Sequence, residues 1–198
     1  LATSGNMSVN QTLFKNLNYD PIKDFAPISN LADVPNVLVI NPDLPAKNIE
    51  QFIKLLKTSP DKFAFGSSGN GGLSHMNGEL FMSVTGTKML HVPYKGLGPA
   101  LNDLVAGQLQ VVFDNLPSSF ALIQGQRIRP LVVTAKERLK SLPDVPTYAE
   151  VGLPALNNPS WFGLAAPANT PTTILDTLNK AVLQALKDPE TIAAIEKQ

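Results

Sequence analysis

Short apolar runs alternate with stretches of helical periodicity along most of the chain. Residues 37–40 form a continuous apolar run, which is typical of a strand buried on both faces of a mostly parallel sheet. Residues 49–56 instead repeat apolar side chains along one helical face, and Asn48 and Gln51 stand at the spacing of a capping box. By the same criteria we expect further strands at 26–32, 63–65, 88–92, 109–113, 131–134 and 161–166, and further helices near 9–17, 76–84, 99–106, 117–124, 147–150, 171–186 and 189–198. This alternation predicts a doubly wound α/β sheet.

The stretch from Phe65 to His75 stands out because glycine and small polar residues separate an apolar run from a helical pattern. A strand that passes through such a loop into a helix leaves several backbone N–H groups and the positive end of the helix dipole aimed at one point. The stretch lacks the Lys-Ser/Thr pair of a P-loop, the third Gly of a dinucleotide-binding loop and the last Gly of a nucleophile elbow. Two interpretations remain: a binding loop for a carboxylate or phosphate, or a flexible Gly/Ser turn without a ligand.

Two other polar segments accompany predicted strands. Residues 3–8 repeat the pattern of small hydroxyl and amide side chains before a helix, although Thr, Ser and Asn are also ordinary helix N-caps. Asp114 follows the strand 109–113 and is the best charged candidate for a cleft, with an N-cap of the next helix as the alternative. Loops at the carboxyl ends of strands in a doubly wound sheet meet at one crevice, so we expect residues 67–74, 94–96 and 114–115 to be neighbours.

Composition narrows the function classes. The 16 basic and 16 acidic residues cancel, so no overall field attracts nucleic acid or an anionic membrane. The absence of cysteine removes disulfides, thiolate metal sites and a Cys nucleophile. His75, Glu79 and His91 are the best metal-binding candidates, but coordination needs a full set of ligands at suitable spacing, so we expect no metal and no cofactor. His75 is expected at the rim of the cleft, either as a hydrogen-bond partner of a ligand or as a helix-capping side chain.

Seven motifs, in this order, resemble those of one known family. They are YDPIKDFAP (19–27), PNVLV (35–39), SSGNG (67–71), HVPYKG (91–96), FDNLPS (113–118), LPDVPT (142–147) and SWFGL (160–164). Each motif alone is weak, but the series covers essentially the whole chain. The series resembles the Bug (Bordetella uptake gene) family, which comprises the TctC-like solute-binding receptors of tripartite tricarboxylate transporters.

The resemblance implies a fold. Members of this family are two-domain periplasmic binding proteins of the type II-like, Venus flytrap kind, in which crossover strands join two α/β domains. Residues 1–40 would form part of domain I, residues 41–159 domain II, and residues 160–198 the return crossover with a further part of domain I. The family's leading segment, with a Pro-Gly-Gly loop that contacts the ligand, and its usual closing helices are not in this sequence. We therefore expect an incomplete first domain that lacks one wall of its cleft.

The resemblance also implies a function and a set of ligand-binding residues. The protein would be a periplasmic monomer that captures a small organic carboxylate, such as citrate, a dicarboxylate, an amino acid, nicotinate or an aromatic acid, and delivers it to a membrane permease. Family members hold such carboxylates with backbone amides and small hydroxyls of facing loops, partly through water. Asp114 would face an amino or hydroxyl group of the ligand. Carried over, the other ligand-binding residues would be Thr3, Ser4 and Asn6 of the first domain and Ser67, Ser68, Gly69, Asn70, Gly71, Ser74 and His75 of the second.

Two alternative functions remain open at this point. The protein could be a periplasmic sensor whose closed form docks a signalling kinase. It could also be an enzyme that acts on carboxylates, with Ser67 or Ser68 as nucleophile, His75 as base and Asp114 as the orienting acid. The enzyme hypothesis requires a serine within hydrogen-bonding distance of His75. A binding receptor needs preorganised donors rather than such a catalytic set, and we favour it for that reason.

Overall fold

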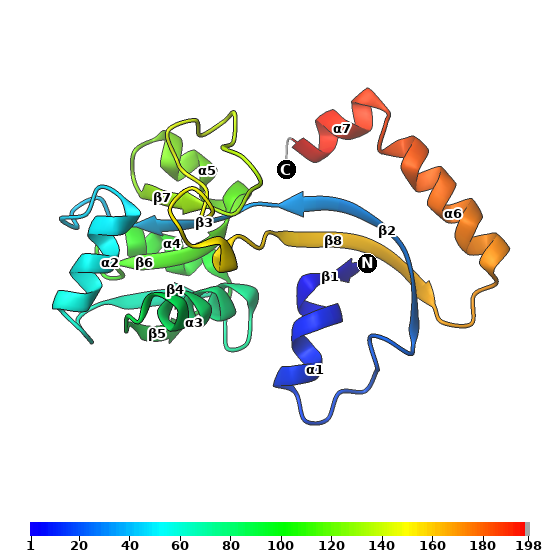
Figure 1. Cartoon of the computed structure of the whole chain (residues 1–198), viewed down its shortest axis with the longest axis horizontal. Coiled ribbons are helices and arrows are strands. Elements are labelled where there is room, and N and C mark those ends of the chain that lie inside the picture. Colours follow the sequence, from blue (N-terminus) through cyan, green and yellow to red (C-terminus); the bar gives the residue numbers. More distant parts are fainter. Residues whose placement is uncertain (197–198) are drawn as a thin grey trace. The chain divides into compact units, whose positions relative to one another are not determined.

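The structure is a computed structural model that describes residues 1–196, and it divides into two compact units. The first unit comprises Leu1–Val34 and Ser160–Gln198, and the second comprises Pro35–Pro159. Figure 1 shows the elements in chain order. The sequence-based boundary after residue 40 needs a correction, because the strand at 36–40 pairs only with strands of the second unit. The expected helix end at 197–198 lies outside the described residues.

The first unit is built on an antiparallel sheet of three strands in the order β1-β8-β2. β1 spans Ala2–Thr3, β2 spans Phe25–Val34 and β8 spans Ser160–Pro167. The two long strands β2 and β8 lie side by side over most of their length (Figure 1). Gly163 of β8 has no space for a side chain, since an added Cβ would lie 2.9 Å from the Ser29 carbonyl oxygen.

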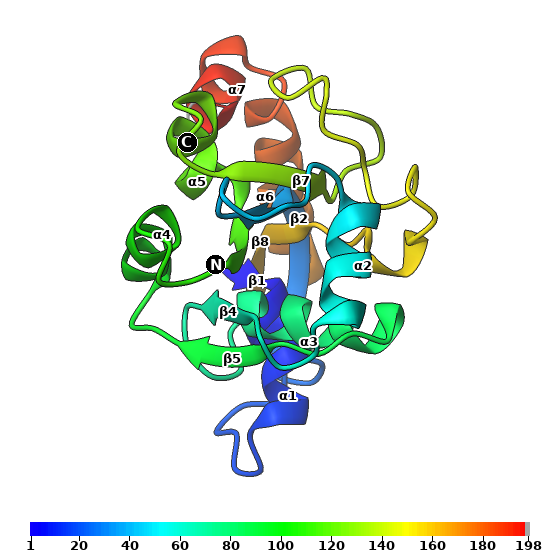
Figure 2. The same ribbon diagram turned by 90° about the vertical axis from the view of Figure 1, so that its left-hand side faces the viewer.

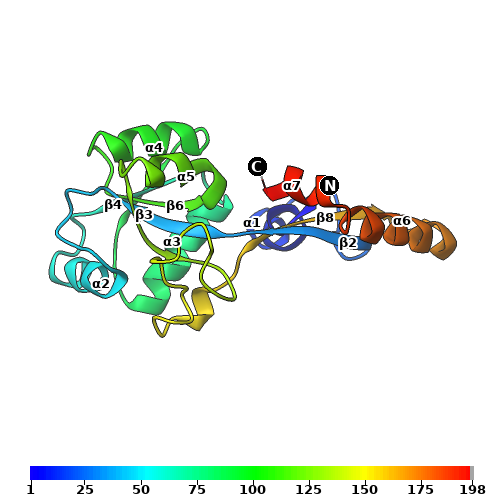
Figure 3. The same ribbon diagram turned by 90° about the horizontal axis from the view of Figure 1, so that it is seen from above.

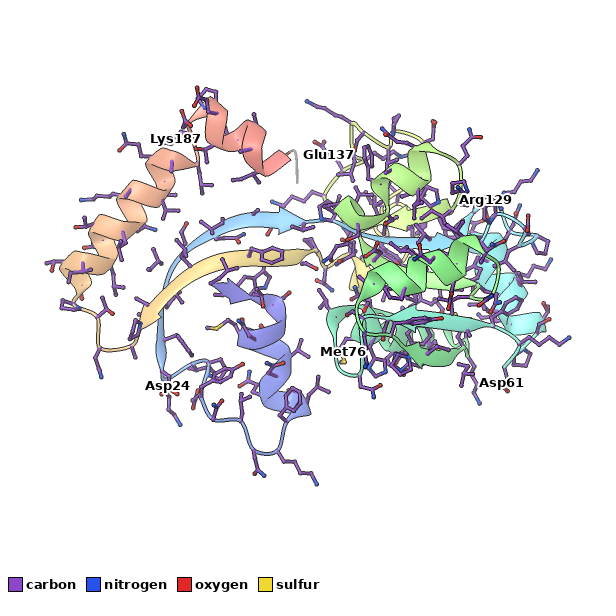
Figure 4. All side chains as sticks on the ribbon, turned by 180° about the vertical axis from the view of Figure 1, so that it is seen from behind. Asp24, Asp61, Met76, Arg129, Glu137 and Lys187 are labelled. Carbon is purple, nitrogen blue, oxygen red and sulfur yellow. The ribbon has the colours of Figure 1, made fainter. Side chains whose placement is uncertain are left out.

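Helices complete the first unit. A π-helical segment (Gly5–Val9) leads into α1 (Asn10–Leu13), and α6 (Thr172–Ala185) and α7 (Pro189–Glu196) follow β8. The first helical segment begins earlier than the sequence predicts, because Thr3 and Asn6 cap it directly after β1. Asn6 Oδ1 accepts the Thr3 N–H at 2.7 Å, and Thr3 Oγ1 accepts the Asn6 N–H at 3.3 Å. Asn179 ties α6 to β2 by donating to the Ile28 carbonyl at 2.6 Å. Figure 4 shows the side chains that project from α6.

The second unit contains a sheet of five strands in the order β5-β4-β6-β3-β7. The strands are β3 (Asn36–Ile40), β4 (Ala64–Ser67), β5 (Leu90–Pro93), β6 (Val111–Asn115) and β7 (Arg129–Val133). β4 is parallel to β5 and β6, whereas β3 is antiparallel to both β6 and β7. β3 is buried on both faces, as its apolar run predicts, but the expected parallel pairing of this strand is wrong. An apolar run indicates that both faces of a strand are covered, but helices can cover a parallel or an antiparallel strand in this way.

Helices cover both faces of this sheet. α2 (Ile49–Thr58) and α3 (Leu73–Thr85) pack with one set of strand side chains, and α4 (Leu97–Val105) and α5 (Leu116–Gln124) pack with the other. Figures 2 and 3 show the two helical layers. Neighbouring residues of β3 alternate between the layers, since Leu38 contributes to the first cluster and Val37 to the second. This alternation confirms the α/β architecture that the sequence predicts.

Both capping pairs that the sequence predicts form hydrogen bonds, but only one of them begins a helix. Asn48 Oδ1 accepts the Gln51 N–H at 2.9 Å and starts α2 as expected. Glu150 Oε2 accepts the Thr147 N–H at 2.7 Å and Thr147 Oγ1 accepts the Glu150 N–H at 3.3 Å, but residues 148–152 form turns rather than the expected helix. Gly152, with φ of 75°, ends the segment after these turns. Among residues 1–196, no helix has the length and apolar character needed to cross a bilayer.

Gly78 of α3 lies against the Phe65 ring of β4, and a Cβ at position 78 would overlap that ring. We expect Gly78→Ala to lower the free energy of unfolding by about 1–3 kcal/mol, because Phe65 is fully buried and the ring has no free space into which to move. Urea denaturation measures the change. Gly98→Ala is the matched control, because Gly98 is also helical but has no atom within 4 Å of an added Cβ. That variant should be up to about 1 kcal/mol more stable than the parent. Equal stability of the two variants would contradict the packing argument.

Candidate functional site

The loop between β4 and α3 is the centre of the candidate site. β4 ends at Ser67 and α3 begins at Leu73, with Gly72 as the N-cap residue. Gly69 and Gly71 have φ angles of 130° and 74°, which L-amino acids with a side chain rarely adopt. The glycines are therefore needed for the path that the loop takes from β4 to α3.

Most backbone amides within this loop are already occupied by the protein. The Ser68 N–H donates to Ser74 Oγ at 2.9 Å, and the Gly69 N–H donates to Ser67 Oγ at 3.2 Å. The Gly71 N–H donates to His75 Nδ1 at 3.0 Å, and the Gly72 N–H donates to the Gly69 carbonyl at 3.3 Å. These four N–H groups therefore stabilise the loop itself, and ligand binding by the loop residues stays a prediction.

Other amide donors remain available at the start of α3. In the described part of the chain, the backbone N–H groups of Asn70, Leu73, Ser74 and His75 make no hydrogen bond. Three of them belong to the first turn of the helix, where N–H groups have no intrahelical partner and the helix dipole is positive. Asn70 and the neighbouring Ser68 are exposed. The N-terminus of α3 is thus suited to binding an anion.

The three serines of the loop have different environments. Ser67 is fully buried, and its Oγ lies 2.6 Å from His91 Nε2 and 3.1 Å from the Gly69 carbonyl oxygen. Ser74 is also buried, and its Oγ lies 3.1 Å from the Oγ of exposed Ser68. The Ser67 side chain is therefore on the buried side of the loop, whereas Ser68 is on its exposed side.

The His75 and His91 rings stack on each other, and each contacts a residue of the loop. Their ring centroids are 3.8 Å apart with 10° between the planes, and Phe65 stacks on His91 at 4.9 Å. His75 accepts the Gly71 N–H at Nδ1, and its Nε2 lies 3.5 Å from Glu79 Oε1. Burial lowers the pKa of His91, the charge of His75 lowers it further, and Glu79 opposes both effects. His91 is a site residue that sequence reasoning considered only as a metal ligand, since only the pairing of β5 with β4 places it beside Phe65 and Ser67.

The serine–histidine geometry differs from that required by the enzyme hypothesis. The hydrogen-bond acceptor nitrogen of His75 is used by Gly71, and its other nitrogen faces Glu79. The serine paired with a histidine is Ser67, which is buried and bonded to His91 instead. Within residues 1–196, no three His, Asp or Glu side chains gather closely enough to hold a metal ion.

Asp114 is in β6 opposite Val37, and only 1% of it is exposed. Asp114 does not cap the next helix, whose N-cap is Asn115, so that interpretation is wrong. Its position in a ligand-binding cleft stays a prediction. Its two carboxyl oxygens and the Ser119 hydroxyl have no hydrogen-bond partner within the described chain. Burial raises the pKa of Asp114 to about 6, and the nearby Ser119 hydroxyl and Asn115 N–H offset this in part.

The remaining predicted residues are placed as follows. Thr3 and Asn6 bond to each other in the first unit, and Ser4 between them has helical backbone angles. In the second unit, the Tyr94 N–H donates to the Ser67 carbonyl at 3.0 Å, so the segment after β5 lies beside the loop as expected. The Tyr94 hydroxyl donates to Asp103 at 2.7 Å, and burial together with this bond raises the pKa of Tyr94 to about 12.

A small hollow with a volume of about 20 Å³ is present elsewhere in the second unit. Its polar lining residues include Asn36, Asn77, Thr134 and Asn158, and it contains none of residues 67–75. The hollow therefore does not include the first turn of α3 or the loop before it.

Replacement of Asp114 tests its raised pKa. The folded-state pKa of about 6 lies above the ordinary value of 3.8 for an Asp carboxyl, so the contribution of this carboxyl to stability is full below about pH 4 and is lost as the pH rises through 6. Asp114→Asn removes the buried charge and should raise the free energy of unfolding by roughly 2–3 kcal/mol at pH 8, with little effect at pH 4. Urea denaturation at both pH values measures this, and exposed Asp144→Asn is the control. A gain that is equal at both pH values would contradict the assignment.

Comparison with known proteins identifies the family. Residues 2–198 match the TctC family, described as tripartite tricarboxylate transporter family receptor. Protein BugT of Bordetella pertussis is 32% identical over 197 residues, which cover 100% of this chain and 60% of BugT. The chain spans between about half and three fifths of the length of such curated relatives, at 52% and 60% for two of them.

Solved structures agree with this assignment. The Rpa4515 protein of R. palustris, solved with adipate, is 37% identical with a TM-score of 0.84, and the match covers 96% of this chain and 64% of that one. MatC of Rhodopseudomonas palustris, solved with bound malate, is 31% identical with a TM-score of 0.83, and the match covers 98% of this chain and 66% of that one. These neighbours have the mixed α/β fold of periplasmic binding proteins, and the present chain corresponds to part of it. The chain therefore belongs to the TctC/Bug family of periplasmic solute-binding receptors.

Proposed function

We propose that this protein binds a small organic carboxylate in the periplasm and delivers it to the membrane permease of a tripartite tricarboxylate transporter. The observation that carries the proposal is the set of unoccupied N–H donors at the start of α3, on Leu73, Ser74 and His75. Two family neighbours were solved with dicarboxylates, adipate and malate, which supports a ligand of this class.

The donors at α3 have the chemistry that a carboxylate needs. Hydrogen bonds to a charged group contribute about 1.5–3 kcal/mol each, and the helix dipole adds about 0.3–1 kcal/mol for an anion near the first turn. The exposed Ser68 hydroxyl is next to these amides and can donate to the same ligand. The uncharged donors explain how a protein with no excess of basic residues can bind an anion.

We also propose that the two compact units correspond to the two domains of the family's fold, with Thr3, Ser4 and Asn6 as the first unit's contribution to the ligand. Thr3 and Asn6 already bond to each other, so the groups that remain for a ligand there include the Ser4 hydroxyl. The protein would act as a monomeric receptor rather than an enzyme. Buried Ser67 and the His75 nitrogens, which face Gly71 and Glu79, support that choice over serine-dependent catalysis.

Ligand binding to the 198-residue chain can be measured by thermal shift and calorimetry with malate, adipate and a panel of mono-, di- and tricarboxylates. A ligand at 100 times its Kd should stabilise the folded state by about 2.7 kcal/mol. Leu73→Pro should weaken binding tenfold or more, because it removes one N–H donor from the first turn of α3. Proline is well tolerated at this position, since Gly72 has the extended ψ of 161° that the residue before a proline prefers.

Two control variants separate the N–H donor from other effects. Leu73→Ala shortens the side chain but keeps the N–H, and it should bind as the parent does. Thr172→Pro places proline at the first position of α6 in the other unit, and it should also bind normally. Stabilisation by no acid in the panel would reject the carboxylate-receptor proposal, and equal binding by Leu73→Pro would reject the role of α3.

A further inference from the structure

We propose that His75 and His91 act as positioning residues for the ligand-binding loop, and that protonation of His75 releases Gly71 from the ring, so that carboxylate binding is lost as the pH falls. The inference rests on the proposed function and adds a proton-controlled step to it. Neither histidine side chain needs to contact the ligand, because each ring acts through the loop between β4 and α3.

The two histidines hold opposite ends of this loop. His91 bonds through Nε2 to Ser67, the last residue of β4, at 2.6 Å. His75 accepts the N–H of Gly71, near the end of the loop, at 3.0 Å. Between these two points lie Ser68, Gly69 and Asn70. The loop is thus fixed at its beginning and near its end by two rings that stack on each other.

The bond from Gly71 defines the tautomer of the neutral His75 ring. A ring nitrogen that accepts a hydrogen bond carries no proton, so the neutral ring has its proton on Nε2, which faces Glu79. Protonation at Nδ1 gives this nitrogen its own N–H, and the Gly71 N–H then has no acceptor. The Gly71 N–H and the new Nδ1–H of His75 would then face each other at the present distance of 3.0 Å between the two nitrogens. Because two donors repel each other, the loop has to move away from His75.

The stacking of the rings makes protonation of the second ring costly as well. Two imidazolium rings at 3.8 Å repel each other, and each loses solvent in the stack. Glu79 of α3 and His75 are the charged groups that act on His91, while β4 contributes Phe65 and Ser67, which do not titrate in this range. Since burial and His75 lower the pKa of His91, its neutral form is favoured in the folded state.

The sign of the pH effect follows from this. A histidine whose folded pKa is lowered contributes fully above its unfolded pKa of about 6.5, and its contribution decreases as the pH falls below that value. The donors of Leu73, Ser74 and His75 directly follow Gly71 and Gly72, so release of Gly71 disorders the segment that leads into them. Affinity for an anion should therefore decrease between about pH 7 and pH 5. A purely electrostatic effect of imidazolium on an anion would have the opposite sign.

The loop can be tested without any ligand by NMR of the full chain between pH 8 and pH 5. The backbone amide signals of Gly69 and Gly71 should shift with the same midpoint as the ring signals of His75 and His91. The matched variant is His75→Asn/His91→Gln, because Asn Oδ1 stands in for the acceptor Nδ1 of His75 and the Gln side-chain amide, which can donate or accept, stands in for Nε2 of His91. Neither replacement titrates, so the amide signals of the double variant should be independent of pH. Gly71 signals that stay constant while the histidines titrate would overturn the proposal.

Binding of malate and adipate, measured by calorimetry at pH 7.5 and pH 5.5, forms the second part of the test. The parent should lose about three- to tenfold more affinity than the double variant on acidification. Protonation of the acids themselves affects both proteins equally and cancels in this comparison. Equal losses, or tighter binding by the parent at pH 5.5, would overturn the proposal. If neither acid binds at any pH while the Gly71 amide still follows the histidines, the choice of ligand class is wrong but the histidine-controlled loop stands.

Discussion

The buried ring of Phe65 is the contact on which the candidate loop most depends. It occupies the space that Gly78 leaves on α3, stacks on His91 of β5 and meets Phe113 of β6 edge to face. One side chain of β4 therefore contacts both neighbouring strands and the helix whose N-terminus carries the unoccupied donors. The position of those donors is set by core packing, so a change in the core at this point alters the site as well as the stability.

The internal hydrogen bonds of the loop leave fewer amides for a ligand, but they order the loop before a ligand binds. A loop with every amide free could surround an anion more completely, but its residues would have to be ordered on binding at about 1–2 kcal/mol each. Here Ser67, Ser74 and His75 accept three of the amides and fix the loop in advance. The amides that remain lie in the first turn of a helix, where the backbone is rigid and the dipole favours an anion.

The sequence predicts elements whose determinants are local. The apolar run 37–40 and the cap formed by Asn48 and Gln51 are formed as expected, because each depends on neighbouring residues. The direction of β3, the inward orientation of Ser67 and the burial of Asp114 depend on distant segments and have no local signal. The same applies to the capping pair of Thr147 and Glu150, which forms its hydrogen bonds without a helix. Family resemblance predicts the class of fold and of ligand, but the roles of the loop residues depend on contacts that only the structure shows.

The position of His91 also distinguishes the serine–histidine contact of this loop from the arrangement that a nucleophilic serine needs. A nucleophilic serine has to be accessible and close to donors that stabilise the oxyanion formed by its attack. Ser67 is fully buried, and its hydroxyl lies between the Gly69 backbone and His91. The amides without a partner in the described chain are instead those at the start of α3. The Ser67–His91 contact therefore fixes the loop, and a fixed set of neutral donors is what the proposed reversible binding of a carboxylate requires.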